Sequence, residues 1–483
     1  MTKLSKEHTY IGMVKKETKH PEWATKFREY GKELRCINGK YYLYSYSNKY
    51  DPDRGRSVKV TGKLLGRITK EEGFIPSEKR RLKEIKDLKC KEYGLSKFIL
   101  KQSKVVENLK KNFPREWKYL LMMAYSRLIH NSPIKRMSED VEHSYLSEEL
   151  GCSLNKKMIP DVLKEAGNKE SERSSYMKSF ITGGDFLLID STFIRCSISE
   201  SALAKEGYNK EDVWESQVSL MYIYSKKREE PVYYRILPGN IRDVKSLSLT
   251  IRDSGVEKVM VIADKGFYSE DNVKELINQG LNFIIPLRRN SGLIKYEGLS
   301  QSKDVFVYQK RGLRYKKYLQ NNGYVYLFLD VKMAGEEESN LILQTESHPE
   351  DVTIENVDEK KERHGTIAFF SNADVEAEEV YTYYKMRLAV EQSFDTLKTV
   401  LKADAPYMSD DDKLQGWMFV NHIAIQWCHE ILRVLKQEKL ISKISLEDAI
   451  RRLAQIKKIK ISDTWYEMEQ TKEENKIATL LLS

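Results

Sequence analysis

Four polar side chains recur at helical spacing in the segment YTYYKMRLAVEQSFDTLKTVLKAD, residues 381–404. This segment has no glycine or proline and is expected to be a helix. At about 100° per residue, four of its polar side chains fall within an arc of about 60°: Tyr384, Arg387, Glu391 and Lys398. Because helices usually keep so narrow a stripe for apolar residues, this row indicates a chemical use. The alternative is a solvated stripe in which Arg387 and Glu391 form an i,i+4 pair, with a contribution of about 0.2–0.5 kcal/mol.

Two aspartates each follow a short apolar run. Asp190 follows FLLI and precedes Ser191-Thr192, whereas Asp264 follows VMVIA and precedes Lys265-Gly266. An acid at the end of a buried strand is often only a turn former or a helix cap. In α/β sheets, however, ligands gather at the ends of strands. Two neighbouring carboxylates repel each other unless a cation lies between them.

The segment around these aspartates predicts a mixed α/β sheet. Its order is βββ-α-β-α-β, which implies an antiparallel start followed by parallel crossovers. The first and fourth strands are then neighbours at the centre of the sheet, so Asp190 and Asp264 should lie close together. If the 381–404 helix packs on this sheet through its apolar face, Glu391 can approach both aspartates. That face consists of Met386, Val390, Phe394, Leu397 and Leu401.

Charge is concentrated at the N-terminal end. Residues 1–120 contain 31 Lys and Arg against 15 Asp and Glu, a net charge of +16, while the whole chain carries +10. The rest of the chain is therefore mildly acidic. This asymmetry predicts a polyanion-binding region attached to a body with another task, although lysine-rich surfaces also serve solubility.

The chain has 483 residues, too many for one ordinary core, and divides into several expected regions. They are a basic β-hairpin DNA-binding region at 1–80, a helical region at 81–180, the first part of the core at 181–290, an inserted mainly-β subdomain at 291–365, the second part of the core at 366–450 and a C-terminal tail at 451–483. The helical region contains SYLSEELGCSLNKKMIPDVLKEAG, which has helix-turn-helix proportions, as do many helix pairs that never touch DNA.

Other features limit the class of protein. The five cysteines are scattered without a C-x-x-C pair, which favours reduced thiols and argues against a structural zinc site. No apolar run is long enough for a membrane span, and no signal peptide is evident. A cytoplasmic protein without a membrane partner is expected. His422 and His429 lie seven residues apart in an apolar helix and are expected to be core or edge residues rather than ligands.

The spacing Y-x2-R-x3-E-x6-K, with the two aspartates before it, resembles the signature of bacterial transposases of the "insertion sequence four" superfamily. LLIDST resembles the strand of their first aspartate, VMVIADKGFYS their second-aspartate motif and FIIPLRR the strand after it. The resemblance covers residues 180–425. It implies a DDE enzyme with a ribonuclease H-like core and a β insertion between the second aspartate and the glutamate.

This resemblance also implies a mechanism and partners. Asp190, Asp264 and Glu391 would be catalytic and would hold two Mg²⁺ ions, for which Mn²⁺ can substitute. Tyr384, Arg387 and Lys398 would bind DNA phosphates. The partners would be double-stranded DNA, as terminal inverted repeats and target, and a second copy of the chain in a synaptic complex. The location would be the cytoplasm of a bacterium or archaeon, associated with the nucleoid. Two alternatives remain: a related metal-dependent DNA nuclease without strand transfer, and an inactive transposase-derived DNA-binding protein.

Overall fold

The computed structural model describes residues 20–77, 88–182, 187–198, 201–208, 214–239, 244–255, 259–262, 268–347, 362–403, 408–461 and 463–482. The chain divides into two compact units. One comprises residues 1–90 with 459–466, and the other comprises residues 91–458 with 467–483.

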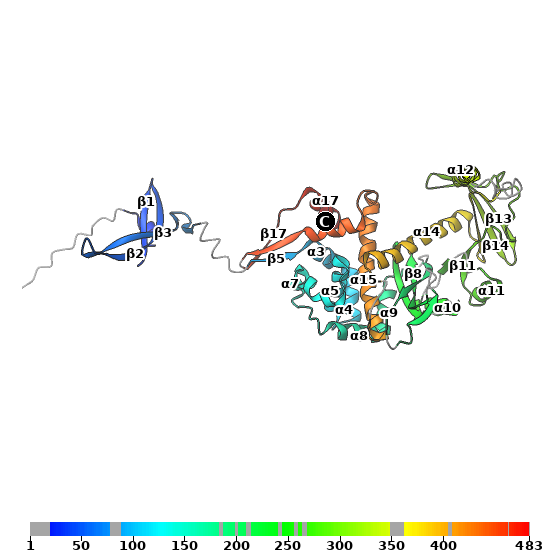
Figure 1. Cartoon of the computed structure of the whole chain (residues 1–483), viewed down its shortest axis with the longest axis horizontal. Coiled ribbons are helices and arrows are strands. Elements are labelled where there is room, and N and C mark those ends of the chain that lie inside the picture. Colours follow the sequence, from blue (N-terminus) through cyan, green and yellow to red (C-terminus); the bar gives the residue numbers. More distant parts are fainter. Residues whose placement is uncertain are drawn as a thin grey trace, which may run out of the picture. The chain divides into compact units, whose positions relative to one another are not determined.

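The first unit contains a four-stranded antiparallel sheet with its own small core. Its elements are α1 (Glu22–Thr25), β1 (Lys32–Ile37), β2 (Lys40–Asp51), β3 (Arg56–Thr69) and β4 (Gly73–Pro76), with the strands in the order β1-β2-β3-β4. The expected hairpin is present as β2 and β3, which pair from Tyr41–Ile68 to Asp51–Arg56. The core of this sheet is formed by Ala24, Leu34, Leu43 and Ile68. The hairpin is thus part of a small β domain (Figure 1).

A bundle of helices follows in the second unit. It comprises α3 (Gly94–Lys101), α4 (Ser103–Asn112), α5 (Trp117–His130), α6 (Ile134–Glu142), α7 (Tyr145–Leu150), α8 (Ile159–Asn168) and α9 (Glu170–Lys178). The helix-turn-helix proportions expected here are not found, since residues 151–158 separate α7 from α8. That connection is longer than the turn of three to four residues in the motif. Pro160 stands in the first turn of α8, where its fixed φ suits a helix start.

A long mixed sheet forms the centre of the second unit. Within the described ranges its strand order is β12-β13-β14-β15-β11-β10-β6-β8-β7, and β9 also pairs with β8. The strands of its first half are β6 (Leu187–Arg195), β7 (Lys205–Tyr208), β8 (Trp214–Ser225), β9 (Glu230–Pro238), β10 (Val259–Ile262) and β11 (Asn282–Leu287). Helices α10 (Val244–Ser254) and α11 (Glu270–Asn278) alternate with the last strands. The expected order is confirmed, with β7 as one additional short strand.

The pairing of β6 confirms the expected centre of the sheet. β6 is antiparallel to β8 and parallel to β10, with Ile189 opposite Val261. Asp190, however, does not end its strand, because β6 continues to Arg195 along β8. It directly follows Ile189, which pairs with Val261 in the described part of the parallel strand β10. The chain is thus a mixed α/β protein with the predicted neighbours at its centre.

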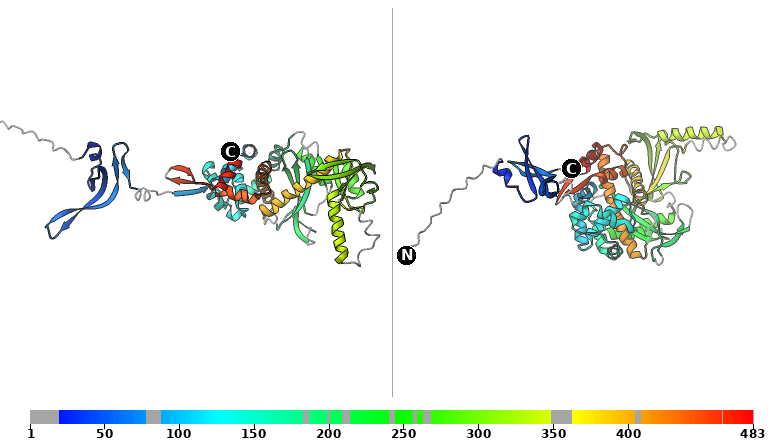
Figure 2. Two further views of the ribbon diagram at one scale, coloured as in Figure 1. Left: turned by 90° about the horizontal axis from the view of Figure 1, so that it is seen from above. Right: turned by 60° about the vertical axis from the view of Figure 1, so that its left-hand side comes forward.

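The strands expected in the insertion extend this sheet at one end. They are β12 (Val305–Tyr308), β13 (Arg311–Gln320) and β14 (Gly323–Asp330), and β15 (Thr366–Ser371) joins them to β11. A helix that was not predicted from the sequence, α12 (Val331–Ser347), lies between β14 and β15 along the chain. Figure 2 shows α12 projecting from the sheet. Arg289 anchors it, because its guanidinium donates to both carboxylate oxygens of Glu337 at 2.9 and 2.8 Å.

Two long helices cover the sheet near β6. α14 (Ala377–Asp395) continues into a π-helical turn, η3 (Thr396–Val400), and α15 (Asp411–Gln437) follows. α15 also packs on α8, where both helices present a glycine. A Cβ on Gly416 would lie 2.0 Å from the carbonyl oxygen of Leu163, and one on Gly167 would lie 1.8 Å from that of Asp412. The helical region therefore shares one continuous core with the sheet.

The C-terminal residues contain regular helices and strands. They contain α16 (Leu446–Gln455), β16 (Lys457–Ile461), β17 (Thr464–Glu467) and α17 (Lys472–Leu482). The strands β17, β16 and β5 (Leu88–Glu92) form a three-stranded sheet in that order. In α17, Ile477, Leu481 and Leu482 are buried, and this apolar face is the reason why the segment packs.

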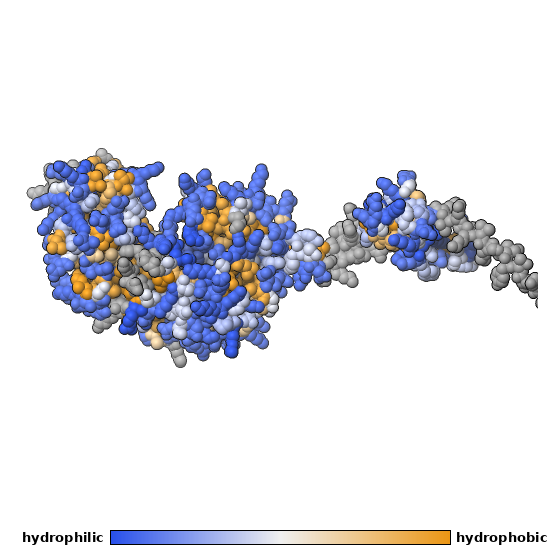
Figure 3. All heavy atoms as spheres, turned by 180° about the vertical axis from the view of Figure 1, so that it is seen from behind, coloured by the Kyte–Doolittle hydropathy of each residue, from blue (hydrophilic) through white to orange (hydrophobic). Residues whose placement is uncertain are grey.

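Hydrophilic side chains dominate the face in Figure 3, where apolar residues form separate patches.

Candidate active site

Asp190 and Glu391 meet at the guanidinium group of Arg387. Nη2 of Arg387 lies 3.0 Å from Oε1 of Glu391, one helical turn further along α14. Nε of the same guanidinium lies 3.6 Å from Oδ2 of Asp190 on β6. The backbone N–H of Ser191 donates to the other oxygen of Asp190 at 2.8 Å. Two of the three predicted acids are therefore brought to one place, although they are 201 positions apart in the sequence.

Asp264 lies outside the described residues, so its assignment stays a prediction. The described part of β10 ends at Ile262, two positions before Asp264. β10 runs parallel to β6, and Val261 is paired with Ile189, the neighbour of Asp190.

Lys398 reaches the same strand as Asp190 from the π-helical turn. Its Nζ donates to Oγ1 of Thr192 at 2.9 Å. Thr192 is two residues beyond Asp190, so both side chains leave the same face of β6. The sequence analysis did not single out Thr192, although its alternation with Asp190 was a usable signal.

The π-helical turn changes the geometry that was expected for Lys398. Tyr384, Arg387 and Glu391 lie within α14, but Lys398 lies within η3. A π turn holds an additional residue, so a step of 100° per residue does not apply through it. Lys398 still points to the sheet because of its contact with Thr192, not because of the regular arc.

Tyr384 has a packing role in this structure. Its ring lies 4.6 Å from that of Phe369 on β15, measured between centroids, at an interplanar angle of 50°. The apolar face beside it is largely confirmed, since Val390, Phe394 and Leu397 are buried. A role of the Tyr384 hydroxyl in DNA binding stays a prediction.

The two histidines of α15 are core residues, as expected. His422 is stacked on the ring of Tyr222, with centroids 6.0 Å apart, and burial lowers its pKa to about 3. Burial also lowers the pKa of His429 to about 4, against a raising contribution from Glu229. Nε2 of His429 lies 2.9 Å from Oγ of Ser393. Both residues are buried, at 0% and 7% exposed, and burial favours the neutral form of each ring.

The acids fit a hard divalent cation. No group of three or more histidine, cysteine, aspartate or glutamate side chains that could hold a metal ion occurs among the described residues, which exclude Asp264. Asp190 and Glu391 nevertheless offer carboxylate oxygens, the donors that Mg²⁺ prefers. The guanidinium group of Arg387 already places a positive charge between them. The charge and the donor type of this cluster thus match a cation site.

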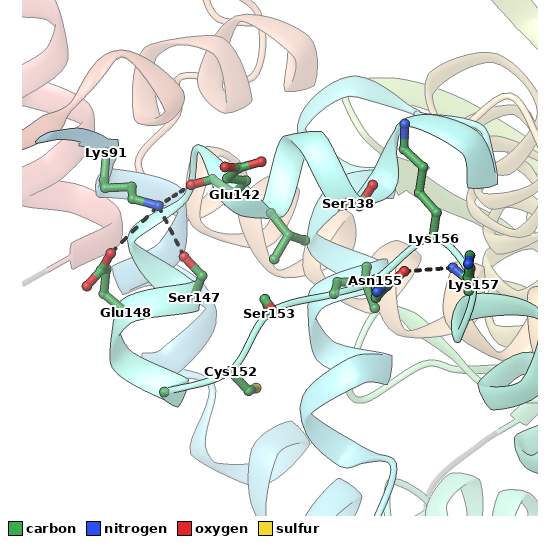
Figure 4. Close-up of a pocket in the computed structure, with 13 residues that line it drawn as sticks. Lys91, Ser138, Glu142, Ser147, Glu148, Cys152, Ser153, Asn155, Lys156 and Lys157 are labelled. Atoms are coloured by element: carbon green, nitrogen blue, oxygen red, sulfur yellow. Dashed lines mark hydrogen bonds and ion pairs between the residues drawn. The ribbon is translucent and has the colours of Figure 1, made fainter.

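A surface groove in the helical region lies apart from these acids. It has a volume of about 900 Å³ and is bordered by α6, α7 and the connection 151–157 (Figure 4). Nζ of Lys91 is held within it, 3.8 Å from the carboxylate of Glu148 and 3.4 Å from Oγ of Ser147. Lys156 and Lys157 extend from the connection at the other side (Figure 4).

The first unit carries cations against aromatic rings. Nζ of Lys59 lies 4.0 Å from the centroid of Tyr46, and the guanidinium of Arg35 lies 5.5 Å from that of Tyr44. Glu33 accompanies both cations, at 3.5 Å from Lys59 and 3.3 Å from Arg35. Stacked aromatics next to cations are typical of surfaces that bind nucleic acid, and they also stabilise small sheets.

The fold and the acid cluster define a mixed α/β protein with a carboxylate site on its central strand. The family model described as "Transposase DDE domain" matches residues 181–427, just over half of the chain. The chain belongs to this family. The matched residues include all six positions that the sequence analysis assigned to the site.

Two solved structures are similar at low identity. The piggyBac transposase in a synaptic complex with hairpin DNA has 10% identity and a TM-score of 0.37, with 70% of this chain and 69% of that chain covered. The Mos1 transposase in a paired-end complex has 14% identity and a TM-score of 0.14, with 32% and 53% covered. No curated protein matches the chain. In the described part of the chain, no helix has the length and apolar character needed to cross a membrane.

Proposed function

We propose that this chain is the DDE transposase of a bacterial insertion sequence of the "insertion sequence four" superfamily. It binds the transposon ends and catalyses magnesium-dependent strand cleavage and strand transfer. The observation that carries this proposal is the convergence of Asp190 and Glu391 on Arg387. Membership of the DDE transposase family supports the general activity. The order of signature residues supports the particular superfamily.

A ribonuclease H-like core is part of this proposal. β6 is antiparallel to β8 on one side and parallel to β10 on the other, and helices connect the later strands. This arrangement supports a ribonuclease H-like fold, because it makes β6 and β10 neighbours at the centre of the sheet. It is also the reason why Asp264 is proposed as the third acid.

Each site residue has a proposed role. Asp190, Asp264 and Glu391 would hold two Mg²⁺ ions, or Mn²⁺ in their place. When bound, such ions lower the pKa of water and stabilise the leaving oxygen of a phosphoryl transfer. Arg387 and Lys398 would bind phosphates next to the cut, Arg387 by a two-pronged contact and Lys398 as a point charge. The hydroxyl of Tyr384 would orient the same strand.

The proposed partner is double-stranded DNA, as terminal inverted repeats and as target. The cation–aromatic pairs of the first unit and its positive charge support a role in holding the ends. Strand transfer of two ends requires that they be brought together, so we expect a homodimer in the synaptic complex. A DNA-bound enzyme of this class would be associated with the nucleoid in the cytoplasm of a bacterium or archaeon.

The test of this proposal is magnesium-dependent cleavage of duplexes that carry an end of the element. Asp190→Asn, Asp264→Asn and Glu391→Gln should each abolish nicking and leave thermal unfolding and end binding largely unchanged. Glu378→Gln is the matched control, since Glu378 is an exposed acid in the first turn of the same helix. A variant at any of the three positions that cuts at the wild-type rate would remove that residue from the site.

Products of the same assay separate the alternatives. Cleavage with joining to a target strand is expected of the transposase. Cleavage without joining would identify a metal-dependent nuclease, and end binding without cleavage would identify an inactive transposase-derived protein.

A further inference from the structure

Arg387 occupies the place of a counter-cation within the acid cluster. Its side chain is 11% exposed, and that of Asp190 is 16% exposed. One guanidinium group spans carboxylates from two elements, β6 and α14, at 3.6 and 3.0 Å. Arg387 and Asp190 are thus partly buried, whereas the side chain of Glu391 is 42% exposed. The interaction of Arg387 with Asp190 is therefore less screened by water than its interaction with Glu391.

Such a cluster has two ways to balance its charge. Without a metal ion, the carboxylates of Asp190 and Glu391 would repel each other, and the guanidinium group offsets that repulsion. The same two carboxylates, whose oxygens Oδ2 of Asp190 and Oε1 of Glu391 face Arg387, would hold a divalent ion. Because the guanidinium and the ion are both positive, they cannot share those oxygens without repelling each other.

We propose that Arg387 is an exchangeable counter-cation, which holds the two acids in position and leaves them when a divalent ion binds. This inference rests on the proposed function, since it assumes that Asp190 and Glu391 hold the ion. Arg387 is a positioning residue in this state. The displaced guanidinium group then becomes available to a DNA phosphate, for which its planar fork is suited.

The exchange couples two ligands. A divalent ion releases Arg387 for phosphate, and a phosphate that takes up Arg387 leaves the carboxylates open to the ion. By linkage, each ligand must raise the affinity for the other by the same factor. The contact with Asp190 is the longer one and joins two separate elements, so it is the contact expected to break first.

The first test measures Mn²⁺ binding to the full chain without DNA, from the electron paramagnetic resonance signal of free Mn²⁺. Arg387→Gln removes the competing charge and should lower the Kd for Mn²⁺ at least threefold. Arg387→Lys keeps the charge and should leave the Kd near the wild-type value. Lys385→Gln is the matched control, because Lys385 lies on the same helix with its Nζ 5.2 Å from the ring centroid of Tyr381. It should not change the Kd.

A second readout distinguishes exchange from simple charge repulsion. The affinity of the wild type for an end duplex, read before cleavage begins, should rise when Mn²⁺ is added. In Arg387→Gln this rise should fall at least threefold, because no guanidinium group is released. An unchanged rise would mean that Arg387 stays on the carboxylates and would overturn the inference.

Failure of the inference differs from failure of the proposed function. If Arg387→Gln binds Mn²⁺ no better than wild type, while Glu391→Gln binds it less well, the counter-cation role is wrong and the metal site stands. If neither Glu391→Gln nor Asp190→Asn weakens Mn²⁺ binding, the acids are not the metal site, and both conclusions fall. Thermal unfolding identifies any variant that has lost its fold, and Arg387→Lys then serves as the decisive comparison.

Discussion

At the scale of single residues, Thr192 on the central strand β6 contacts Lys398 in the π-helical turn η3 that follows α14. Its hydroxyl accepts a hydrogen bond from Nζ of Lys398, and its side chain is 8% exposed. Thr192 therefore fixes one end of a flexible lysine two positions from Asp190. A lysine so held loses less conformational entropy when it binds a phosphate than one that is free to move.

Thr192→Val tests this positioning, because it keeps the shape of the side chain and removes the hydroxyl. We expect the cleavage rate to fall about tenfold, which corresponds to about 1.4 kcal/mol. Thr366→Val is the control, since Thr366 is buried in β15 of the same sheet and its hydroxyl donates to the backbone carbonyl of Arg363, away from Lys398. In a Lys398→Met background, Thr192→Val should have no additional effect. A further tenfold loss there would mean that Thr192 acts independently of Lys398.

At the scale of elements, α15 combines a buried position with polar residues. Within the described residues, neither ring nitrogen of His422 has a hydrogen-bond partner. The rings of Tyr222 and Tyr234 face it at 6.0 and 5.1 Å. Such a site disfavours the charged imidazolium, which is the physical cause of the lowered pKa.

The lowered pKa values of His422 and His429 predict that the free energy of unfolding decreases in acid. The pKa of His422 is about 3 in the folded chain, below its ordinary value of 6.5. Between these values the unfolded chain binds the additional proton. The part of the free energy of unfolding that depends on neutral His422 is therefore fully present above pH 6.5. It decreases as the pH falls towards 3, by up to about 1.4 kcal/mol per pH unit. His429 acts in the same direction.

Chemical denaturation of His422→Leu and the wild type across pH 3–8 measures this contribution. The variant should show a shallower decrease of unfolding free energy below pH 6.5. Burial raises the pKa of Glu92 to about 7, so this carboxyl makes the free energy of unfolding decrease as the pH rises from 4.5 to 7, opposite to His422. The difference between variant and wild type removes the effect of Glu92, which is the same in both proteins. Parallel pH curves for the two proteins would contradict the assignment to His422.

At the scale of the whole molecule, charge follows the division into units. Residues 1–87 contain 22 Lys and Arg against 12 Asp and Glu, a net charge of +10, which equals the net charge of the whole chain. Residues 88–483 are therefore balanced. The four-stranded sheet at 32–76 has its own core, whereas the helical region packs with α15 and cannot be removed without opening the main core.

Removal of residues 1–87 should weaken DNA binding and reduce its salt dependence. At about 100 mM salt we expect an affinity loss of about tenfold or more, and each lost phosphate contact should lower the slope of log K against log salt by about 0.9. Gel-shift titrations over a salt series compare the fragment 88–483 with the full chain. Unchanged thermal unfolding of the main unit is the control, and equal slopes would place DNA binding in the main unit.

Several features of this protein followed from the sequence alone, because they depend on local pattern. Alternating apolar runs predicted the order of strands and helices from β6 to β11, and the chain order of the strands then required β6 and β10 to be neighbours. The apolar stripe of α14 and the burial of His422 in α15 also followed from periodicity. The spacing of Tyr384, Arg387, Glu391 and Lys398, with the two aspartates before it, resembled a transposase signature, and the match to the transposase DDE domain confirms that general class.

Other features were decided by tertiary structure, because they depend on residues far apart in the chain. No local pattern states that Arg387 lies between Asp190 and Glu391, or that Lys398 meets Thr192. The π-helical turn η3 follows α14, whereas helical periodicity alone predicts a regular helix there. The sequence thus predicted the residues of the candidate site, and long-range packing decided how the charges of Asp190, Arg387 and Glu391 meet.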